Sequence, residues 1–160
     1  MKSPKLSIYG IGNPLIDIVI QAKEEDLNAL NLDKGVMHLV EETRQKEIIN
    51  YFNDCDPKYF PGGSAPNTLL ACAGFGISSL IAGKIGQDEF GDIYIQQAEK
   101  FGVISGLVQR SGPTGSSIIL VTPDGERTMN THLGMCREFS ENDVDARKLS
   151  ESSYFYFTGY

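Results

Sequence analysis

Short hydrophobic runs alternate along the chain with segments in which hydrophobic residues recur every three or four positions. The runs predict buried strands, and the helical spacing predicts helices packed against them. Because strands and helices alternate, the pattern predicts an α/β fold in which flanking helices cover a parallel sheet. The strands are expected at residues 8–11, 79–85, 104–109 and 153–158, and the helices at 41–52, 64–74 and 88–101.

Further segments with β character interrupt this alternation. In one of them, isoleucines at every second position alternate with Asp17 and other residues, which is typical of a half-exposed strand. Asp17 therefore points away from the isoleucine face. These segments are expected to form a small second sheet over one edge of the first. Its strands are expected near 16–21, 36–40 and 57–61, and a hairpin is expected at 114–122 and 127–131.

The stretch from Phe60 to Ile77 combines a double glycine with the start of a helix. Gly62 and Gly63 allow a ligand to approach the main chain closely, and Ser64 is a good N-cap. Asn67 follows one turn later. A helix start with free N–H groups binds oxygen-rich ligands well. The simpler alternative is a glycine turn in front of a core helix.

Two other glycine motifs resemble nucleotide-binding signatures, but each lacks a residue that the signature requires. Gly10-Ile11-Gly12 lacks the third glycine of a dinucleotide-binding loop, because Leu15 stands in its place. Gly83-Lys84 suggests a phosphate loop, but Ile85 occupies the position of the required serine or threonine.

Composition narrows the function further. The 160 residues carry 14 Lys and Arg against 21 Asp and Glu, a net charge of −7 without a basic cluster, so nucleic-acid binding is not expected. No apolar run is long enough to span a membrane, so no membrane partner is expected either. The odd set Cys55, Cys72 and Cys136 suggests a reducing cytoplasm, and with only His38 and His132 no zinc site is expected.

Four motifs occur together in one order and cover nearly the whole chain. They are Gly12-Asn13-Pro14-Leu15-Ile16-Asp17, Gly62-Gly63-Ser64-Ala65-Pro66-Asn67, Gly86-Gln87-Asp88-Glu89-Phe90-Gly91 and Asp124-Gly125-Glu126-Arg127-Thr128. This set resembles the ribokinase/PfkB family of carbohydrate and nucleoside kinases. The first motif looks most like that of the adenosine kinase branch.

The resemblance implies a ribokinase-like α/β core with a small β lid, and transfer of the ATP γ-phosphoryl group to a primary hydroxyl of a sugar or nucleoside. In the family, the residue matching Asp17 accepts hydrogen bonds from sugar hydroxyls, and those matching Asn13, Gly63 and Asn67 complete the cradle. The chemistry agrees, because an ionised carboxylate only accepts hydrogen bonds, whereas an asparagine amide both donates and accepts.

The predicted substrate-binding residues are Asn13, Asp17, Gly62, Gly63, Ser64, Asn67, Met37, Leu39, Arg127 and Met129. Some have simpler alternatives. Asp17 is alternatively a solvated strand residue, and Asn67 an additional helix cap. Tyr160 is a further candidate for substrate contact, because it follows a glycine at the sheet edge where α/β proteins bind ligands.

The apolar candidates and the arginine also leave alternatives open. Met37, Leu39 and Met129 either touch the substrate from the lid or belong to the core. Arg127 either reaches the substrate or a phosphate, or pairs with Glu126 or another acid of the hairpin. Binding of a phosphosugar would need basic residues near the lid, for which Lys34, Lys58 and Arg127 are weak candidates.

The family's glycine-rich anion hole and the aspartate that takes the hydroxyl proton have no counterpart in the sequence. Residues 1–160 are therefore expected to be the N-terminal, acceptor-binding half of a ribokinase-like domain. No catalytic residue and no metal site is expected in them, and the sites for ATP and Mg²⁺ are expected mainly in the other half. The chain alone is expected to be inactive, and 154–158 would form an exposed hydrophobic edge.

Two functions from different classes remain. One is an ATP-dependent nucleoside or sugar kinase, and the other is a non-catalytic nucleoside- or sugar-binding module derived from a truncated kinase. The sequence does not identify the small-molecule substrate. A homodimer formed through the lid is compatible with either function.

Overall fold

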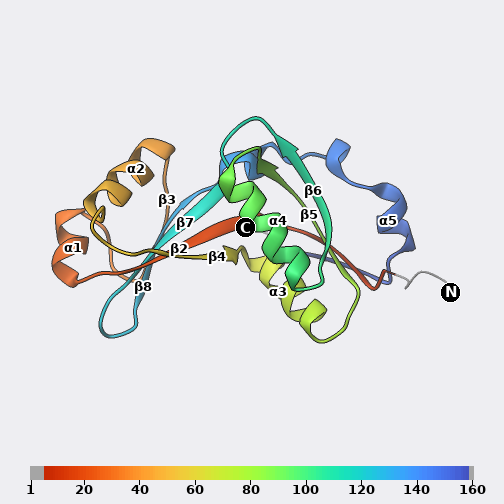
Figure 1. The fold of residues 1–160 in the computed structure, drawn as a ribbon, viewed down its shortest axis with the longest axis horizontal. Coiled ribbons are helices and arrows are strands. Elements are labelled where there is room, and N and C mark those ends of the chain that lie inside the picture. Colours follow the sequence, from red (N-terminus) through yellow and green to blue (C-terminus); the bar gives the residue numbers. More distant parts are fainter. Residues whose placement is uncertain (1–5, 159–160) are drawn as a thin grey trace.

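The computed structural model describes residues 6–158, which form two sheets at opposite ends of an elongated molecule (Figure 1). The first sheet is fully parallel, with the strand order β6-β5-β1-β9. Its strands are β1 (Ile8–Ile11), β5 (Ser79–Gly86), β6 (Ile104–Arg110) and β9 (Tyr154–Phe157), in agreement with the prediction.

Both faces of the first sheet are covered over its central strands, whereas Tyr154, Phe155 and Phe157 of the edge strand β9 are exposed. The long helices α3 (Ser64–Gly74) and α4 (Glu89–Lys100) pack on one face, where Leu69 and Tyr94 join the main hydrophobic core. On the other face, Tyr9, Leu80 and Ala82 form a second core cluster. The covering elements there are the 3₁₀-helices η1 (Gly134–Glu138) and η2 (Glu141–Asp143) and helix α5 (Ala146–Glu151).

The second sheet has five strands in the order β3-β8-β7-β2-β4. The predicted segments are present in it as β2 (Leu15–Gln21), β3 (Met37–Leu39) and β4 (Lys58–Gly62). The predicted hairpin is present as β7 (Gly115–Val121) and β8 (Arg127–His132), and it joins this sheet, which the sequence did not show. The reason is that β7 pairs in parallel with β2, a long-range contact that local periodicity does not reveal.

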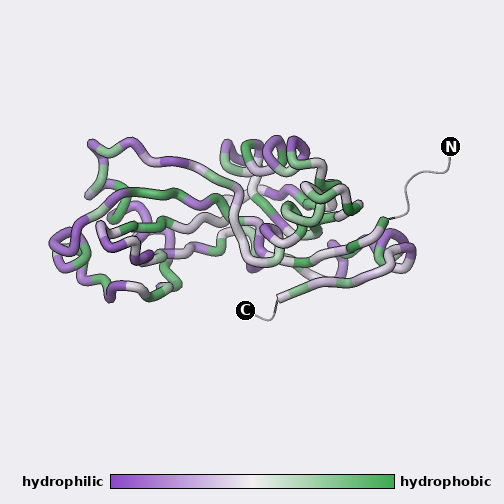
Figure 2. Tube along the Cα trace, turned by 90° about the horizontal axis from the view of Figure 1, so that it is seen from below, coloured by the Kyte–Doolittle hydropathy of each residue, from purple (hydrophilic) through white to green (hydrophobic). Residues whose placement is uncertain are grey.

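Two helices cover one face of the second sheet. They are α1 (Glu24–Ala29) and α2 (Glu42–Tyr51), at the end of the molecule remote from α5 (Figure 1). Ile16, Ile18 and Ile20 pack under them, together with Leu27 and Ile48. Figure 2 shows hydrophobic stretches along the strands of both sheets and hydrophilic residues gathered at the turns.

Glycine conformations mark both ends of α3. Ser64 was expected to be the N-cap, but the N-cap is Gly63, and Ser64 is the first helical residue. At the other end, Gly76 has φ of +81°, and its N–H donates to the Ala73 carbonyl while the Ile77 N–H donates to Cys72. These two bonds are a Schellman cap. The helix therefore ends at Gly74, in agreement with the predicted range 64–74.

Candidate functional site

Three segments meet where the two sheets join. The β1–β2 turn packs so closely on the start of α3 that a Cβ atom on Gly12 would lie 2.7 Å from Ala65 Cβ. Gly63 has φ of +99°, and a Cβ there would lie 2.1 Å from the backbone oxygen of Asn13. Glycine is required at Gly63 both by its left-handed backbone and by this close approach. The two predicted motifs around Asn13 and Gly63 are thus in direct contact.

Asp17 lies on the face of β2 opposite the buried isoleucines, as the alternation predicts. Its carboxylate is half-buried and packs over Gly62, where a Cβ atom would lie 2.3 Å from Asp17 Oδ1. Burial raises the pKa of Asp17, and the positive charge of Arg127 partly opposes this effect. Within residues 6–158 no hydrogen bond occupies the carboxylate. It therefore keeps its acceptor positions available for a ligand.

Strand register places the other predicted residues of this sheet on the same face as Asp17. Asp17 stands beside Phe60 of β4 and beside Ser117 of β7. Because side chains alternate along each strand, every second position belongs to the same face. The face consists of one row with Phe60, Asp17, Ser117, Thr131 and Leu39, a second row with Lys58, Val19, Ile119, Met129 and Met37, and Arg127 in a third row. We call these eleven residues the open face.

The outer part of the open face is exposed, since α1 and α2 cover the opposite side of the sheet. Met37 is 48% exposed and Leu39 66% exposed, which excludes the alternative that these two side chains belong to the core. Met129 is half-buried beside them. The register therefore places Asp17 and these three apolar residues on one face of the sheet.

Arg127 makes no salt bridge with an acid among the described residues, so the alternative of a hairpin ion pair is not observed. Lys34 differs, because its ammonium bonds Glu24 at 2.5 Å and Asp124 at 2.6 Å, and these bonds raise its pKa to about 12. Lys34 is therefore engaged at the tip of the second sheet. Arg127 remains the cation of the open face whose charge acts on Asp17.

The two predicted asparagines border different pockets. Asn13 lines a pocket of about 410 Å³ at the carboxyl ends of β1 and β9, together with Ile11, Gly12, Cys136, Phe139, Phe155, Phe157 and Thr158. Asn67 is exposed and lines a pocket of about 550 Å³ between β4, α3 and α4. Its backbone N–H donates to Gly63, but its side chain forms no cap, so the cap alternative is not observed within the described residues. Tyr160 lies outside those residues.

Sequence reasoning missed the role of Asp88. This residue is the N-cap of α4 and accepts a hydrogen bond from the Gly91 N–H at 2.9 Å. It also accepts bonds from the Thr114 N–H at 2.8 Å and from the Thr114 hydroxyl at 2.5 Å. The third family motif thus ties the first sheet to the segment that leads into β7. The position of an aspartate before a helix predicts only the first of these bonds.

Neither a membrane-spanning helix nor a metal-binding group of side chains is present among the described residues. None of the helices in residues 6–158 has the length and apolar character needed to cross a bilayer. Over the same residues, no group of three or more His, Cys, Asp and Glu side chains is arranged to hold a metal ion.

Comparison with known proteins gives consistent matches. The family model described as pfkB family carbohydrate kinase matches residues 38–160. Adenosine kinase from Schizosaccharomyces pombe is 25% identical over 96% of this chain and 46% of its own length. Among solved structures, a probable sugar kinase from Rhizobium etli has a TM-score of 0.87 at 29% identity, covering 96% of this chain and 46% of its own. Adenosine kinase from Sinorhizobium meliloti has a TM-score of 0.85 at 31% identity, and the match covers 96% of this chain and 47% of that kinase.

The chain thus spans about half the length of the relatives that it matches. Their structures confirm the predicted ribokinase-like α/β fold for this half. Because the family model matches more than three quarters of the residues, the match does not depend on a single motif. The chain belongs to the pfkB family of carbohydrate kinases.

Proposed function

We propose that this chain supplies the acceptor site of an ATP-dependent kinase that phosphorylates a primary hydroxyl of a nucleoside or sugar. The observation that carries the proposal is the Asp17 carboxylate. It is half-buried over Gly62, without a hydrogen-bond partner among the described residues, at the edge of an open and mostly uncharged face. A carboxylate in such a place accepts hydrogen bonds from two neighbouring sugar hydroxyls.

The rest of the open face favours a nucleoside over a phosphosugar as the acceptor. Beyond Lys58, the second row is apolar, and Val19, Met129 and Met37 are its accessible members, since Ile119 is buried. Apolar and thioether side chains suit the flat face of a base. A phosphate group would need several free cations close together, but Lys34 is already paired, and Lys58 on β4 is separated from Arg127 on β8 by two strands. The adenosine kinases among the relatives point to the same acceptor class.

The second sheet acts in this proposal as a lid over the acceptor. Asp17 and Asn13 would hold the sugar, with Asn67 and the Gly63 backbone on the α3 side of the junction. Arg127 would approach the phosphoryl group or the acceptor from the third row. Closure of apolar side chains over the sugar would exclude water and strengthen these polar contacts.

ATP and Mg²⁺ would be held mainly outside residues 1–160. Phosphoryl transfer needs a group that takes the hydroxyl proton and positive charge around the phosphoryl oxygens. The described residues offer no metal-binding group of acids, and the cations of the open face are Arg127 and Lys58, neither of which has an ion-pair partner among them. We therefore expect the chain alone to be inactive, and the whole protein to carry the proton acceptor and the ATP site.

The test is a kinase assay on the whole protein with ATP and Mg²⁺ against adenosine, other nucleosides, ribose and fructose. We expect turnover with at least one nucleoside and a large loss of kcat/KM in Asp17→Ala. Binding of a nucleoside without turnover would support the binding-module alternative. No binding and no turnover by folded protein would contradict both functions.

A further inference from the structure

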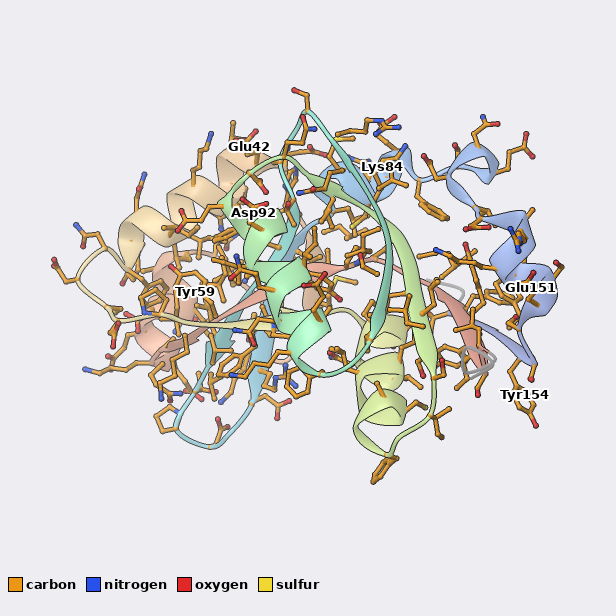
Figure 3. All side chains as sticks on the ribbon, turned by 45° about the vertical axis from the view of Figure 1, so that its right-hand side comes forward. Glu42, Tyr59, Lys84, Asp92, Glu151 and Tyr154 are labelled. Carbon is orange, nitrogen blue, oxygen red and sulfur yellow. The ribbon has the colours of Figure 1, made fainter. Side chains whose placement is uncertain are left out.

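Lys84 is a buried lysine in a strand whose eight residues are all buried. Its side chain is only 10% exposed, and it points to the face of the first sheet that η1 and η2 cover, as the labelled residue in Figure 3 shows. Removing an ammonium group from water is unfavourable unless it is paired and hydrogen-bonded. The position of Lys84 therefore needs an explanation that hydrophobic packing does not give.

The partners of Lys84 lie at the ends of two consecutive 3₁₀-helices. Its Nζ atom bonds the Glu138 carbonyl at 2.6 Å, at the end of η1, and Asp143 Oδ2 at 2.8 Å, at the end of η2. The same oxygen of Asp143 accepts bonds from the Ser140 N–H at 2.8 Å and the Ser140 hydroxyl at 3.0 Å. The bond from Lys84 lowers the pKa of Asp143. One ammonium group thus joins both helices to β5.

The segment held in this way forms one side of the pocket that Asn13 lines. Cys136 and Phe139 of this segment border the pocket, and the Cys136 thiol donates to the Pro14 carbonyl at 3.4 Å. Pro14 directly follows Asn13 in the β1–β2 turn. A shift of residues 134–143 would therefore be transmitted to the turn that carries Asn13.

We infer that Lys84 is a positioning residue that fixes residues 134–143 against β5 and thereby sets the Cys136–Phe139 side of the Asn13 pocket. A hydrophobic side chain at position 84 would be buried without the cost of desolvating a charge. Unlike such a side chain, the Lys84 ammonium group fixes the direction of the contact, because it forms hydrogen bonds to two defined oxygens. None of the sequence motifs assigns this role to Lys84.

Cys136 reports directly on this contact. Its side chain is 6% exposed, and burial raises its pKa to about 12, so the thiol reacts slowly while the segment is in place. Cys55 is exposed and provides an internal reference in the same molecule. If Lys84 holds the segment, loss of its charge exposes Cys136 and leaves the reactivity of Cys55 unchanged.

The experiment labels the whole protein with N-ethylmaleimide and follows the Cys136 and Cys55 peptides by mass spectrometry. In Lys84→Met we expect Cys136 to react at least tenfold faster. The matched control is Lys148→Met, since Lys148 is an exposed lysine that pairs with Asp145, two residues beyond the segment, at 3.5 Å. Cys136 in Lys148→Met should react at the parent rate. A Cys136 rate in Lys84→Met within twofold of the parent would overturn the inference.

Further variants separate positioning from a general loss of folding. Asp143→Asn keeps the ammonium and should also expose Cys136, and it carries the test if Lys84→Met does not fold. Lys84→Arg keeps the charge and should restore protection. Equal labelling of Lys84→Arg and Lys84→Met would contradict the assignment to the charge.

A kinetic measurement rests on the proposed function. In Lys84→Met the acceptor KM should rise at least fivefold while kcat and the KM for ATP stay within twofold, and Lys84→Arg should recover the parent KM. A fall in kcat at unchanged acceptor KM would contradict the positioning role. If the protein shows no kinase activity, the proposed function fails, and the labelling experiment still decides on Lys84.

Discussion

Gly62 is the position where the smallest change in the chain should disturb the proposed acceptor site. In Gly62→Ala, the added methyl carbon would lie 2.3 Å from Asp17 Oδ1, 2.4 Å from its Cγ and 2.6 Å from Oδ2, whereas ordinary contacts begin at 3.4 Å. The Asp17 carboxylate must therefore retreat by about 1 Å. A displacement of ~1 Å in a positioning group lowers kcat/KM by roughly 100-fold, or about 2.7 kcal/mol.

The assay compares kcat/KM for the acceptor in Gly62→Ala, Gly74→Ala and the parent protein. Gly74 is the matched control because a Cβ atom there meets nothing within 4 Å. Gly74→Ala should keep the parent kcat/KM and gain ~0.5–1 kcal/mol in stability, since alanine is the better helix residue. A folded Gly62→Ala with kcat/KM within threefold of the parent would refute the contact of Asp17 with the acceptor.

Three further predictions concern stability, each measured by urea unfolding. Gly63→Ala should lower the unfolding free energy by about 2–4 kcal/mol, because left-handed backbone strain adds to a clash with the Asn13 carbonyl. The control Gly102→Ala should lower it by only ~1–2 kcal/mol, because Gly102 is left-handed but lies in open space. Equal losses in the two variants would contradict the close approach of Gly63 to Asn13. Asp17→Asn should stabilise the protein at pH 7 but not at pH 3. Burial raises the pKa of the Asp17 carboxyl above 3.8, so the folded state holds the proton more tightly than the unfolded state and loses stability as Asp17 ionises. A gain in stability at both pH values would argue against this cause. Asp88→Ala should lower the unfolding free energy by about 2–4 kcal/mol, because it removes three hydrogen bonds, and Asp88→Asn should lower it less. Equal losses in the two variants would count against the hydrogen bonds as the cause.

Local patterns in the sequence predict the elements of this fold well. The isoleucine alternation places Asp17 on the correct face of β2. The helix expected at 88–101 is present as α4, and it ends just before Gly102, which has φ of +80° and whose N–H donates to the Glu99 carbonyl. In these cases the physical cause lies within four residues, so the sequence displays it.

Features that depend on long-range pairing were not predictable in the same way. The parallel pairing of β2 with β7 joins segments about one hundred residues apart, and no local signal specifies it. The same holds for the ion pair of Lys84 with Asp143, because a lysine in an apolar run gives no sign of its partner. Asp17 and Met129 were both predicted as site residues, but only the strand register shows that they share one face.

The central claim is that Asp17 holds the hydroxyl groups of the acceptor. The most direct measurement is calorimetric titration of adenosine into the whole protein and into Asp17→Asn, without ATP. A hydrogen bond to a charged group contributes about 1.5–3 kcal/mol and one to a neutral group about 0.5–1.5 kcal/mol. Loss of the charge at two hydroxyl groups should therefore cost about 2 kcal/mol, which weakens binding by roughly 30-fold. Adenosine binding with the same Kd in both proteins would contradict the claim.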